Sequence, residues 1–383
     1  IAEAISKMTF GNFVGVELND ELQQQDFFQP EYGSFVLELT NSKVFDFKGA
    51  DAIILGETIA KPVITYGNVE IDIKEAVNVW KAPLESVFPT KTKITNKETI
   101  SVPNYTISQK ATHGHAIAKP RVFIPVFPGT NCEYDSKRAF EKAGAQVETL
   151  VIANLSLQAL EETIVKMEKM IHNAQMIMLP GGFSAGDEPE GSGKFIAATF
   201  RNPIIKEAVM DLLQTRDGLM LGICNGFQAL VKLGLVPYGE IRDIDENSPT
   251  LTYNQIGRHI SCLVDTKITS NLSPWLWGVE TGDIYTIPVS HGEGRFIAPQ
   301  PVLEELAANG QIATQYVDPS GNPSYDIRYN PNGSIMAIEG ITSPDGRVFG
   351  KMGHSERIGA GLYKNVLGEK DQKLFVSGVN YFK

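Results

Sequence analysis

Short apolar runs and helical apolar stripes alternate along the chain after residue 119. The apolar runs have the length of buried β-strands, and they occupy residues 121–127, 146–152, 176–179 and 219–223. Elsewhere apolar side chains recur at spacings of three and four, as on the packed face of a helix: these are Leu157, Leu160, Ile164, Met167 and Ile171. Strands that are apolar throughout need cover on both faces. The pattern therefore predicts an α/β fold with a doubly wound, mostly parallel sheet.

Two further helices complete this pattern. Residues 132–143 form a helical stretch that ends near Gly144. Another helix opens at Asn202-Pro203, where Asn caps the helix and Pro occupies its first turn. Its inward-facing side chains are expected to be Ile204, Ile205, Ala208 and Leu212. In sheets of this kind the reactive site lies beyond the carboxyl ends of the strands.

The first part of the chain has a different pattern. Short β-rich runs are expected there at 34–39 and 52–55. A helix is expected after Asp72, and a polar stretch rich in Thr, Lys and Ser follows without periodicity. We therefore predict a smaller α+β fragment over 1–92, a linker over 93–118 and the main α/β domain over 119–383. Because the chain begins at Ile1 rather than Met, we expect it to be a piece of a longer protein.

Composition and charge narrow the possible functions. The 383 residues carry 45 acidic and 34 basic side chains, a formal net charge of −11. This charge disfavours a nucleic-acid binder or a partner of anionic membranes. No apolar run reaches the roughly 18 residues of a membrane-spanning helix. The three cysteines, Cys132, Cys224 and Cys262, are too few for a disulfide framework. We expect a cytoplasmic protein with reduced thiols that acts on a small molecule.

One cysteine stands in a motif that suits a nucleophile. Gly222 and Gly226 flank Cys224 at a predicted strand–turn–helix junction. Such a turn is tight, and a Cβ two residues before or after the nucleophile would collide with neighbouring backbone. A thiol at a helix N-terminus also favours the thiolate, because the helix dipole stabilises negative charge. The backbone N–H of Asn225 then suits an oxyanion. A buried structural cysteine beside glycines has the same pattern.

A histidine and a glutamate near the C-terminus supply partners for this thiol. His354 and Glu356 are two positions apart, so in extended backbone they point to the same side, about 6.6 Å apart along the chain. The pair alone also fits a surface turn. With Cys224 it makes up a nucleophilic triad, in which a carboxylate orients the imidazole that moves the proton of the thiol.

A glycine-rich turn follows the predicted strand at 176–179. Its backbone amides, within residues 180–187, can approach the same reaction centre, although an ordinary loop has the same composition. Residues 191–194 are similar to a phosphate-binding loop, but that motif needs Gly at Glu188 and Ser or Thr at Phe195. We therefore predict no ATP site here.

The other two cysteines are expected to be structural. Cys132 is predicted to be a packed thiol at a helix start, and Cys262 a core residue within an apolar run. Neither has a His–acid pair nearby in the sequence. We predict no metal site in the chain.

Residues 119–383 resemble the class I, triad-type glutamine amidotransferase family, in the form found at the C-terminus of phosphoribosylformylglycinamidine synthases of purine biosynthesis. Five segments in the family's order carry this resemblance: 127–133, 180–187, 221–228, 290–295 and 352–357. Residues 1–92 look like the tail of the synthetase region of those enzymes, on the evidence of residues 33–39 and 55–58 and of their position.

The resemblance implies a role for each matching residue. Cys224 would be the nucleophile, His354 the general base and acid, and Glu356 the orienting carboxylate. Backbone amides would surround the oxyanion, and three side chains would hold the α-amino and carboxylate end of glutamine. The amides are those of Gly182, Phe183 and Asn225, and the side chains are Gln228, Ser290 and His291.

The chain departs from the family beside these residues. Phe227 stands where Cys is common, and Gly353 and Ser355 stand where Pro often flanks the histidine. The triad itself is intact, but the rigidity of the segment around His354 needs another source.

The resemblance also implies a reaction and partners. Glutamine would be hydrolysed to glutamate through a γ-glutamyl thioester, and the ammonia would pass to the synthetase region of the parent enzyme, which uses ATP and magnesium. Most of that region is expected to be missing from this chain, so the chain itself is expected to hold no cofactor. Two other functions stay open: a fragment that is silent until it docks on the synthetase, and a different cysteine hydrolase on a similar sheet.

Overall fold

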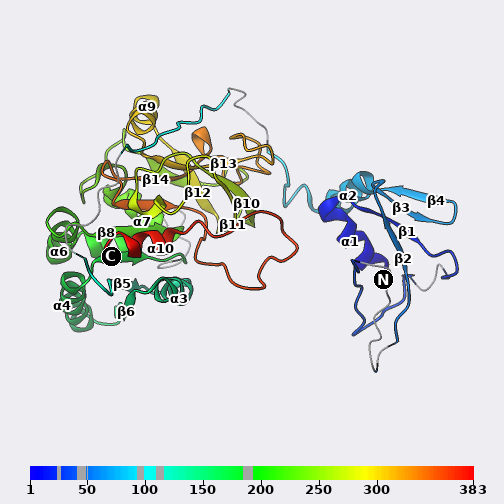
Figure 1. Cartoon of the computed structure of the whole chain (residues 1–383), viewed down its shortest axis with the longest axis horizontal. Coiled ribbons are helices and arrows are strands. Elements are labelled where there is room, and N and C mark those ends of the chain that lie inside the picture. The colour runs from blue at the N-terminus through cyan, green and yellow to red at the C-terminus, as the bar shows by residue number, and fades with distance from the viewer. Residues whose placement is uncertain (24–26, 41–48, 50, 93–98, 109–115, 184–192) are drawn as a thin grey trace. The chain divides into compact units, whose positions relative to one another are not determined.

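A computed structural model (Figure 1) describes the chain except for residues 24–26, 41–48, 50, 93–98, 109–115 and 184–192. The chain divides into two compact units, residues 1–90 and 91–383. Within the described residues, no helix has the length and apolar character needed to cross a bilayer.

The described part of the first unit combines a four-stranded sheet with two α-helices. Its elements are α1 (Ala2–Asn12), β1 (Gly15–Leu18), β2 (Gly56–Ile59), β3 (Val63–Tyr66), β4 (Val69–Asp72), α2 (Ile73–Lys81) and a 3₁₀ helix at Ala82–Leu84. The strand order is β2-β1-β3-β4. Its buried apolar cluster is small and consists of Ile64, Ile73 and Val77, with Phe10, Val16 and Leu18 packed against them.

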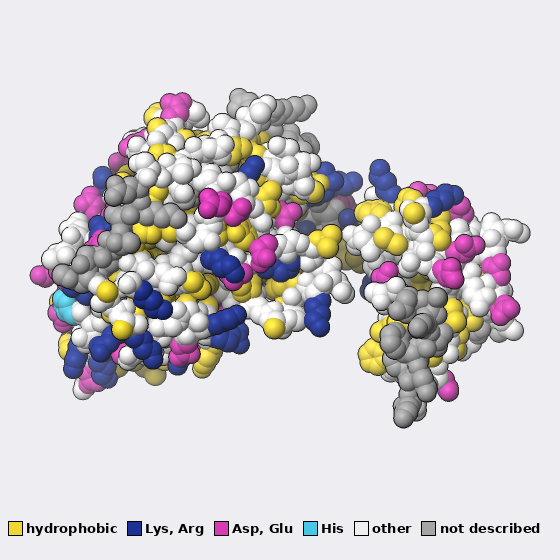
Figure 2. Space-filling view, in the orientation of Figure 1, with side chains coloured by type: hydrophobic (Ala, Val, Ile, Leu, Met, Phe, Trp, Pro, Cys, Tyr) yellow, Lys and Arg dark blue, Asp and Glu magenta, His cyan; other side chains and the backbone are white. Residues whose placement is uncertain are grey.

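The sequence predicted a helix of this unit correctly but misplaced its strands. The helix expected after Asp72 is α2, and the Asp72 carboxylate caps it by accepting the N–H of Glu75 at 2.8 Å. Residues 34–39 and 52–55 form no strand, and β2 begins only at Gly56. Their apolar side chains have no sheet face to cover; Phe35, for example, is 86% exposed. Figure 2 shows exposed hydrophobic side chains on this unit.

The second unit is built around a nine-stranded sheet of order β11-β10-β13-β14-β15-β8-β7-β5-β6. Its strands are β5 (Arg121–Val126), β6 (Gln146–Val151), β7 (Met176–Leu179), β8 (Leu219–Ile223), β10 (Ile260–Ile268), β11 (Ile284–His291), β13 (Ile312–Val317), β14 (Ile338–Thr342) and β15 (Val348–Lys351). From β15 to β6 neighbouring strands are parallel, and from β11 to β15 they are antiparallel. A separate two-stranded sheet pairs β9 (Thr250–Tyr253) with β12 (Glu293–Ile297).

Helices cover the parallel half of the large sheet on both sides. The α-helices of this unit are α3 (Glu133–Ala143), α4 (Leu157–Asn173), α5 (Lys194–Phe200), α6 (Pro203–Gln214), α7 (Asn225–Leu233), α8 (Leu235–Tyr238), α9 (Gln300–Ala308) and α10 (Leu374–Asn380), and 3₁₀ helices lie at Pro274–Leu276 and Ile335–Ala337. In Figure 1, α4 and α6 lie on one side of these strands, and α3 and α10 lie on the other. The predicted α/β, doubly wound class is confirmed. The antiparallel half was not predicted.

The helical apolar stripes are confirmed in part. Ile164, Met167 and Ile171 of α4 are buried. Leu157, in the first turn of that helix, is 81% exposed, and Ile204 of α6 is 45% exposed. These two inward predictions were wrong; in α6 the buried neighbour is Ile205, which is 0% exposed.

The described residues of the expected linker lie against the second unit. The N–H of Tyr105 donates to the carbonyl oxygen of Thr269 at 3.0 Å, and Ile100 and Ile117 pack against the core. Gly310 makes room for the Tyr105 ring, because a Cβ there would lie 2.3 Å from it. These residues therefore belong to the second unit, which begins at Lys91.

Three neighbouring parallel strands bring the sequence motifs together. Strands β7, β8 and β15 are adjacent, and Gly222 pairs with Leu179 while Ile223 pairs with Lys351. Their carboxyl ends therefore lie at the same edge of the sheet. The glycine-rich turn, Cys224 and the His354 segment are the next residues along the chain after these three strands.

Candidate active site

Cys224 lies at a strained turn between β8 and α7. Its φ of 53° and ψ of −105° are unfavourable for a side-chain-bearing residue, and such conformations cost on the order of 1–3 kcal/mol. A Cβ at Gly222 would lie 2.5 Å from Leu230 Cδ1, and one at Gly226 would lie 2.0 Å from the Leu179 carbonyl oxygen. The predicted need for glycine on both sides of the cysteine is confirmed.

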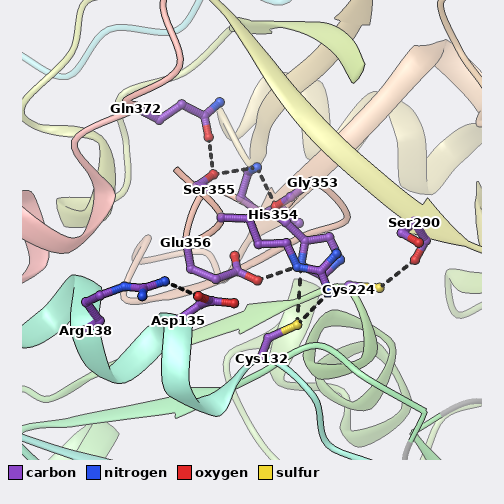
Figure 3. Close-up of polar contacts among 12 residues, drawn as sticks. Cys132, Asp135, Arg138, Cys224, Ser290, Gly353, His354, Ser355, Glu356 and Gln372 are labelled. Atoms are coloured by element: carbon purple, nitrogen blue, oxygen red, sulfur yellow. Dashed lines mark hydrogen bonds and ion pairs between the residues drawn. The ribbon is translucent and has the colours of Figure 1, made fainter. Parts of the chain in front are cut away.

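The surroundings of Cys224 hold its thiol at the helix N-terminus. Its backbone N–H donates to the Lys351 carbonyl oxygen at 2.8 Å, which ties the turn to β15. The sulfur lies 3.7 Å from the carbonyl oxygen of Ser290 (Figure 3), and the residue is 5% exposed.

His354 and Glu356 form a buried pair beside this thiol. Nδ1 of His354 and Oε1 of Glu356 are 2.6 Å apart, and the two residues are 1% and 2% exposed (Figure 3). The Cys224 sulfur lies close enough to this imidazole to interact with it electrostatically. Burial alone would lower the pKa of His354, but the Glu356 carboxylate and Cys224 raise it well above its ordinary value. Burial alone would raise the pKa of Glu356, but His354 lowers it. The arrangement favours imidazolium beside carboxylate.

The predicted substrate-binding residues line one recess. Its walls are Gly182, Phe183, Cys224, Gln228, Ser290, His291, Gly292 and Glu293. Gln228 is anchored there because its Nε2 donates to the Glu293 carbonyl oxygen at 2.5 Å and its Oε1 accepts from Asn225 Nδ2 at 3.0 Å. The structure therefore brings five of the predicted residues to the thiol of Cys224: Gly182, Phe183, Gln228, Ser290 and His291. Asn225 is not among the walls.

His291, in the wall of this recess, has one ring nitrogen for which the described residues provide no hydrogen-bond partner. The Asn254 amide nitrogen donates to the His291 and Arg258 carbonyl oxygens, so its oxygen faces His291 Nδ1 at 3.0 Å and accepts from it. Nε2 is buried with no hydrogen-bond partner in the described part of the chain. Burial, with nearby His354 and His259, lowers the pKa of His291 to about 3. The ring is neutral, and its Nε2 suits a ligand that donates a hydrogen bond.

One of the two amides expected from the glycine-rich turn, that of Phe183, is already hydrogen-bonded. The N–H of Phe183 donates to the Gly129 carbonyl oxygen at 2.7 Å, so it is already engaged. Gly182 has a φ of 142°, and a Cβ there would lie 2.5 Å from the same Gly129 oxygen. An oxyanion role for Phe183 would require this bond to break. Residues 184–187 of the turn, and most of the rejected phosphate loop, lie outside the described residues.

Sequence reasoning missed the surroundings of Cys132. The residue is fully buried at the start of α3, as predicted. Its sulfur lies 3.8 Å from His354 Nδ1 and accepts a hydrogen bond from Arg357 Nη2 at 3.0 Å. The contact joins residues 222 positions apart, so no local motif indicates it. The contact arises because Cys132 follows β5, which neighbours β7 in the folded sheet.

The structure corrects the prediction for Cys262 and gives a place to His259. Cys262 is exposed rather than part of the core; it lies near the N-terminal end of β10, where it pairs with Val289 of β11. His259, to which the sequence gave no role, places Nε2 3.0 Å from Ser290 Oγ and its ring beside Phe183. It therefore stands at the edge of the recess.

Among the described residues, one cluster has the ligand types for a metal ion. Single ligand atoms of Cys132, His354 and Glu356 lie within 4.8 Å of one another. The Arg357 guanidinium contacts the sulfur, and its positive charge opposes a cation there. His354 and Glu356 Oε1 are already hydrogen-bonded to each other, so the arrangement suits proton transfer better than metal binding.

Comparison with known proteins identifies the class of this protein. Residues 119–382 match the family described as the CobB/CobQ-like glutamine amidotransferase domain. The chain belongs to this family of glutamine amidotransferases. Residues 1–118 lie outside the matched segment, so the interpretation of residues 1–92 as a synthetase tail stays a prediction.

Particular relatives sharpen this assignment. Phosphoribosylformylglycinamidine synthase subunit PurQ of Methanococcus maripaludis strain S2 is 34% identical over 239 residues, which are 62% of this chain and 82% of the relative. Subunit PurQ of Aquifex aeolicus is 31% identical over 248 residues, covering 65% and 93%. A chain in the structure of PurLQS from Thermotoga maritima is 28% identical with a TM-score of 0.50, covering 69% of this chain and all of that one. The resemblance stated from the motifs is confirmed.

Proposed function

We propose that the chain is the glutaminase part of a phosphoribosylformylglycinamidine synthase: it hydrolyses glutamine to glutamate and supplies ammonia to a synthetase partner. Its family and its similarity to PurQ subunits support this reaction. The observation that carries the proposal is the meeting of a strained thiol, a buried His–Glu pair and a recess in one place.

The first half of the reaction uses Cys224 and His354. The Cys224 thiolate attacks the side-chain amide carbon of glutamine, and the carbonyl oxygen becomes an oxyanion. Backbone N–H groups of Gly182 and Asn225 are the proposed donors to that oxyanion. The imidazolium of His354 then protonates the amide nitrogen, the C–N bond breaks, and ammonia leaves. A γ-glutamyl thioester stays on Cys224.

The second half consumes one water molecule. Neutral His354 takes a proton from the water as it attacks the thioester carbon. The C–S bond breaks, glutamate leaves, and the Cys224 thiolate is restored beside imidazolium. Glu356 stabilises the imidazolium and orients its ring throughout. The net change is glutamine plus water to glutamate plus ammonia.

The recess fits the other end of glutamine. The α-ammonium group is a hydrogen-bond donor, and the bare Nε2 of neutral His291 is an acceptor of the right kind. Gln228 and Ser290 complete the proposed contacts with the α-amino and carboxylate groups. An acceptor on a neutral ring adds no charge that would repel the ammonium group.

The proposed partner is a synthetase that uses ATP and magnesium. The similarity to a chain of the PurLQS structure supports a synthetase partner, and ATP and magnesium are proposed to act on that partner. We also propose a cytoplasmic location, in keeping with a biosynthetic role and three unpaired cysteines.

Glutamine hydrolysis tests the proposal. Glutamate release is measured with the chain alone and after addition of a PurL-type synthetase, for the unaltered protein, Cys224→Ala and the control Cys262→Ala. We expect Cys224→Ala to lower the rate by at least about 10³-fold. Cys262→Ala should leave the rate unchanged, because Cys262 is exposed and is not a wall of the recess. Glutamate release by Cys224→Ala at the wild-type rate would contradict the proposal.

Two other outcomes separate the alternatives. Activity that appears only with the synthetase would identify a chain that is silent until it docks. Failure of glutamine to protect Cys224 from a general thiol reagent would instead favour a different cysteine hydrolase.

A further inference from the structure

A buried ion pair lies beside the His354 segment and is not among the predicted site residues. Lys351 Nζ and Glu339 Oε1 are 3.1 Å apart, and both side chains are 0% exposed. Lys351 is the last residue of β15 and Glu339 lies in the adjacent β14. Removing two charges from water is costly, so a buried pair is weak evidence for stability. Its other contacts indicate what it does.

These contacts go to the residues on both sides of His354. Glu339 Oε1 accepts the Gly353 N–H at 2.6 Å, and Lys351 Nζ donates to the Gly353 carbonyl oxygen at 3.0 Å and to Ser355 Oγ at 3.1 Å. With Glu339 as its third acceptor, the ammonium group uses all three of its donors. The second Glu339 oxygen accepts from Thr314 Oγ1 at 2.5 Å. Every charged atom of the pair thus has a partner.

Ser355 extends the network to the antiparallel half of the sheet. Its hydroxyl donates to Gln372 Oε1 at 2.6 Å (Figure 3), and Gln372 Nε2 donates to Thr266 Oγ1 of β10 at 3.1 Å. The backbone N–H of His354 donates to the Pro288 carbonyl oxygen of β11 at 2.8 Å. Each residue from 353 to 355 is therefore bonded to a neighbouring element of the sheet.

The close approach of Gly353 to Glu339 depends on glycine. A Cβ at this position would lie 2.1 Å from Ile287 Cδ1 and 2.9 Å from Glu339 Oε1. A proline here would have no N–H for Glu339 to accept. In this chain, hydrogen bonds to a buried ion pair restrain the backbone around the histidine.

We propose that Lys351 and Glu339 are positioning residues that hold Gly353 and Ser355 so that the His354 ring sits between the Cys224 thiol and Glu356. The inference rests on the proposed glutaminase function. A displacement of about 1 Å in a reacting group can cost about 10²-fold in rate. Loss of the pair should therefore reduce kcat and leave the glutamine recess, which has other walls, intact.

The main test is the double variant Lys351→Met/Glu339→Gln, which removes both charges and so leaves neither unpaired. The control is Lys267→Met, since Lys267 of β10 also donates to a backbone oxygen, that of Gly321, at 2.9 Å. We expect the double variant to lose about 10- to 100-fold in kcat, with KM for glutamine changed less than about threefold. Lys267→Met should keep both constants. Each kcat is normalised to the concentration of active sites, measured as the amount of Cys224 that iodoacetamide alkylates.

A second variant tests the network in case the double variant misfolds. A second measurement, thiol alkylation, tests it in case the unaltered protein has no glutaminase activity. Ser355→Ala keeps the ion pair and removes one tether, so a smaller loss in kcat is expected. Alkylation of Cys224 by iodoacetamide at pH 6 reports the imidazole next to the thiol, and it should slow by about tenfold in the double variant. A merely structural role would lower the melting temperature without slowing this reaction.

The outcomes separate the two proposals. Unchanged kcat and unchanged alkylation at pH 6 in both variants would overturn the positioning role. Wild-type protein that alkylates faster than both variants but hydrolyses no glutamine, with or without the synthetase, would overturn the proposed function and support the positioning role.

Discussion

The two sides of the recess are held in place by different physical means. Cys224 stands in a turn shaped by steric exclusion, where Gly222 and Gly226 leave no room for a side chain. His354 stands in a segment held by hydrogen bonds from buried charged and polar side chains, chiefly Lys351 and Glu339. The position of Cys224 thus depends on close packing of neighbouring backbone. The position of His354 depends on hydrogen bonds to residues of other strands.

Because of this difference, substitutions near Cys224 and substitutions near His354 should have different effects. A turn shaped by exclusion fails when an atom is added, because backbone atoms cannot move aside without disturbing two elements. A segment held by hydrogen bonds shifts when a bond is lost, and its neighbours can relax around it. We therefore expect abrupt losses at the thiol side and graded losses at the imidazole side.

The largest effect is expected from Gly226→Ala. The added Cβ would lie 2.0 Å from the Leu179 carbonyl oxygen, at the junction of β7 and α7. We expect a loss of about 3 kcal/mol in the free energy of unfolding, measured by urea denaturation, together with loss of glutaminase activity. The control is Gly359→Ala, whose nearest contact would be an ordinary 3.5 Å to Leu362 Cδ1. Equal stability of the two variants would break the comparison.

A smaller but diagnostic effect is expected from Glu356→Gln. The carboxylate raises the pKa of His354 against the effect of burial, so its removal should lower that pKa. Activity needs imidazolium to protonate the leaving nitrogen, and it falls as pH rises through the pKa of His354. The alkaline limb of kcat/KM should therefore move to lower pH, and kcat should fall by at least about 10²-fold.

The pH profile of a matched variant completes this test. Glu304→Gln changes an exposed glutamate on α9 and should leave the profile unmoved. An alkaline limb at the wild-type position in Glu356→Gln would show that another group sets the pKa of His354.

The smallest effect is expected from Gly353→Ala. The clash is with Ile287 Cδ1, the end of a flexible side chain, rather than with backbone. We expect a cost of about 1–2 kcal/mol in the free energy of unfolding and a loss of about tenfold in kcat. The double variant Gly353→Ala/Ile287→Val removes the clashing methyl group and should recover part of both losses. A double variant no better than the single one would mean that the contact with Glu339, rather than Ile287, limits this position.

The sequence predicted the parallel half of the sheet well because its signals are local. Residues 121–127 and 176–179 are continuous apolar runs, and the observed strands β5 and β7 match them within a residue. The strand predicted at 34–39 was wrong, because the spacing of apolar residues does not reveal whether a neighbouring strand is available to pair with. The antiparallel strands after residue 250 were not predicted, although some of them pair over short distances in the chain, as β14 does with β15.

The amino-acid sequence by itself indicated the nucleophilic cysteine, its glycine-flanked turn and the His354–Glu356 pair. Each of these depends only on residues within a few positions of one another. Only the tertiary structure decided that Cys132 and Arg357 border the imidazole, that His291 is a neutral acceptor and that Lys351 and Glu339 hold the histidine backbone. The physical reason is that side-chain contacts and desolvation depend on which strands lie next to one another, and strand order is a property of the folded sheet.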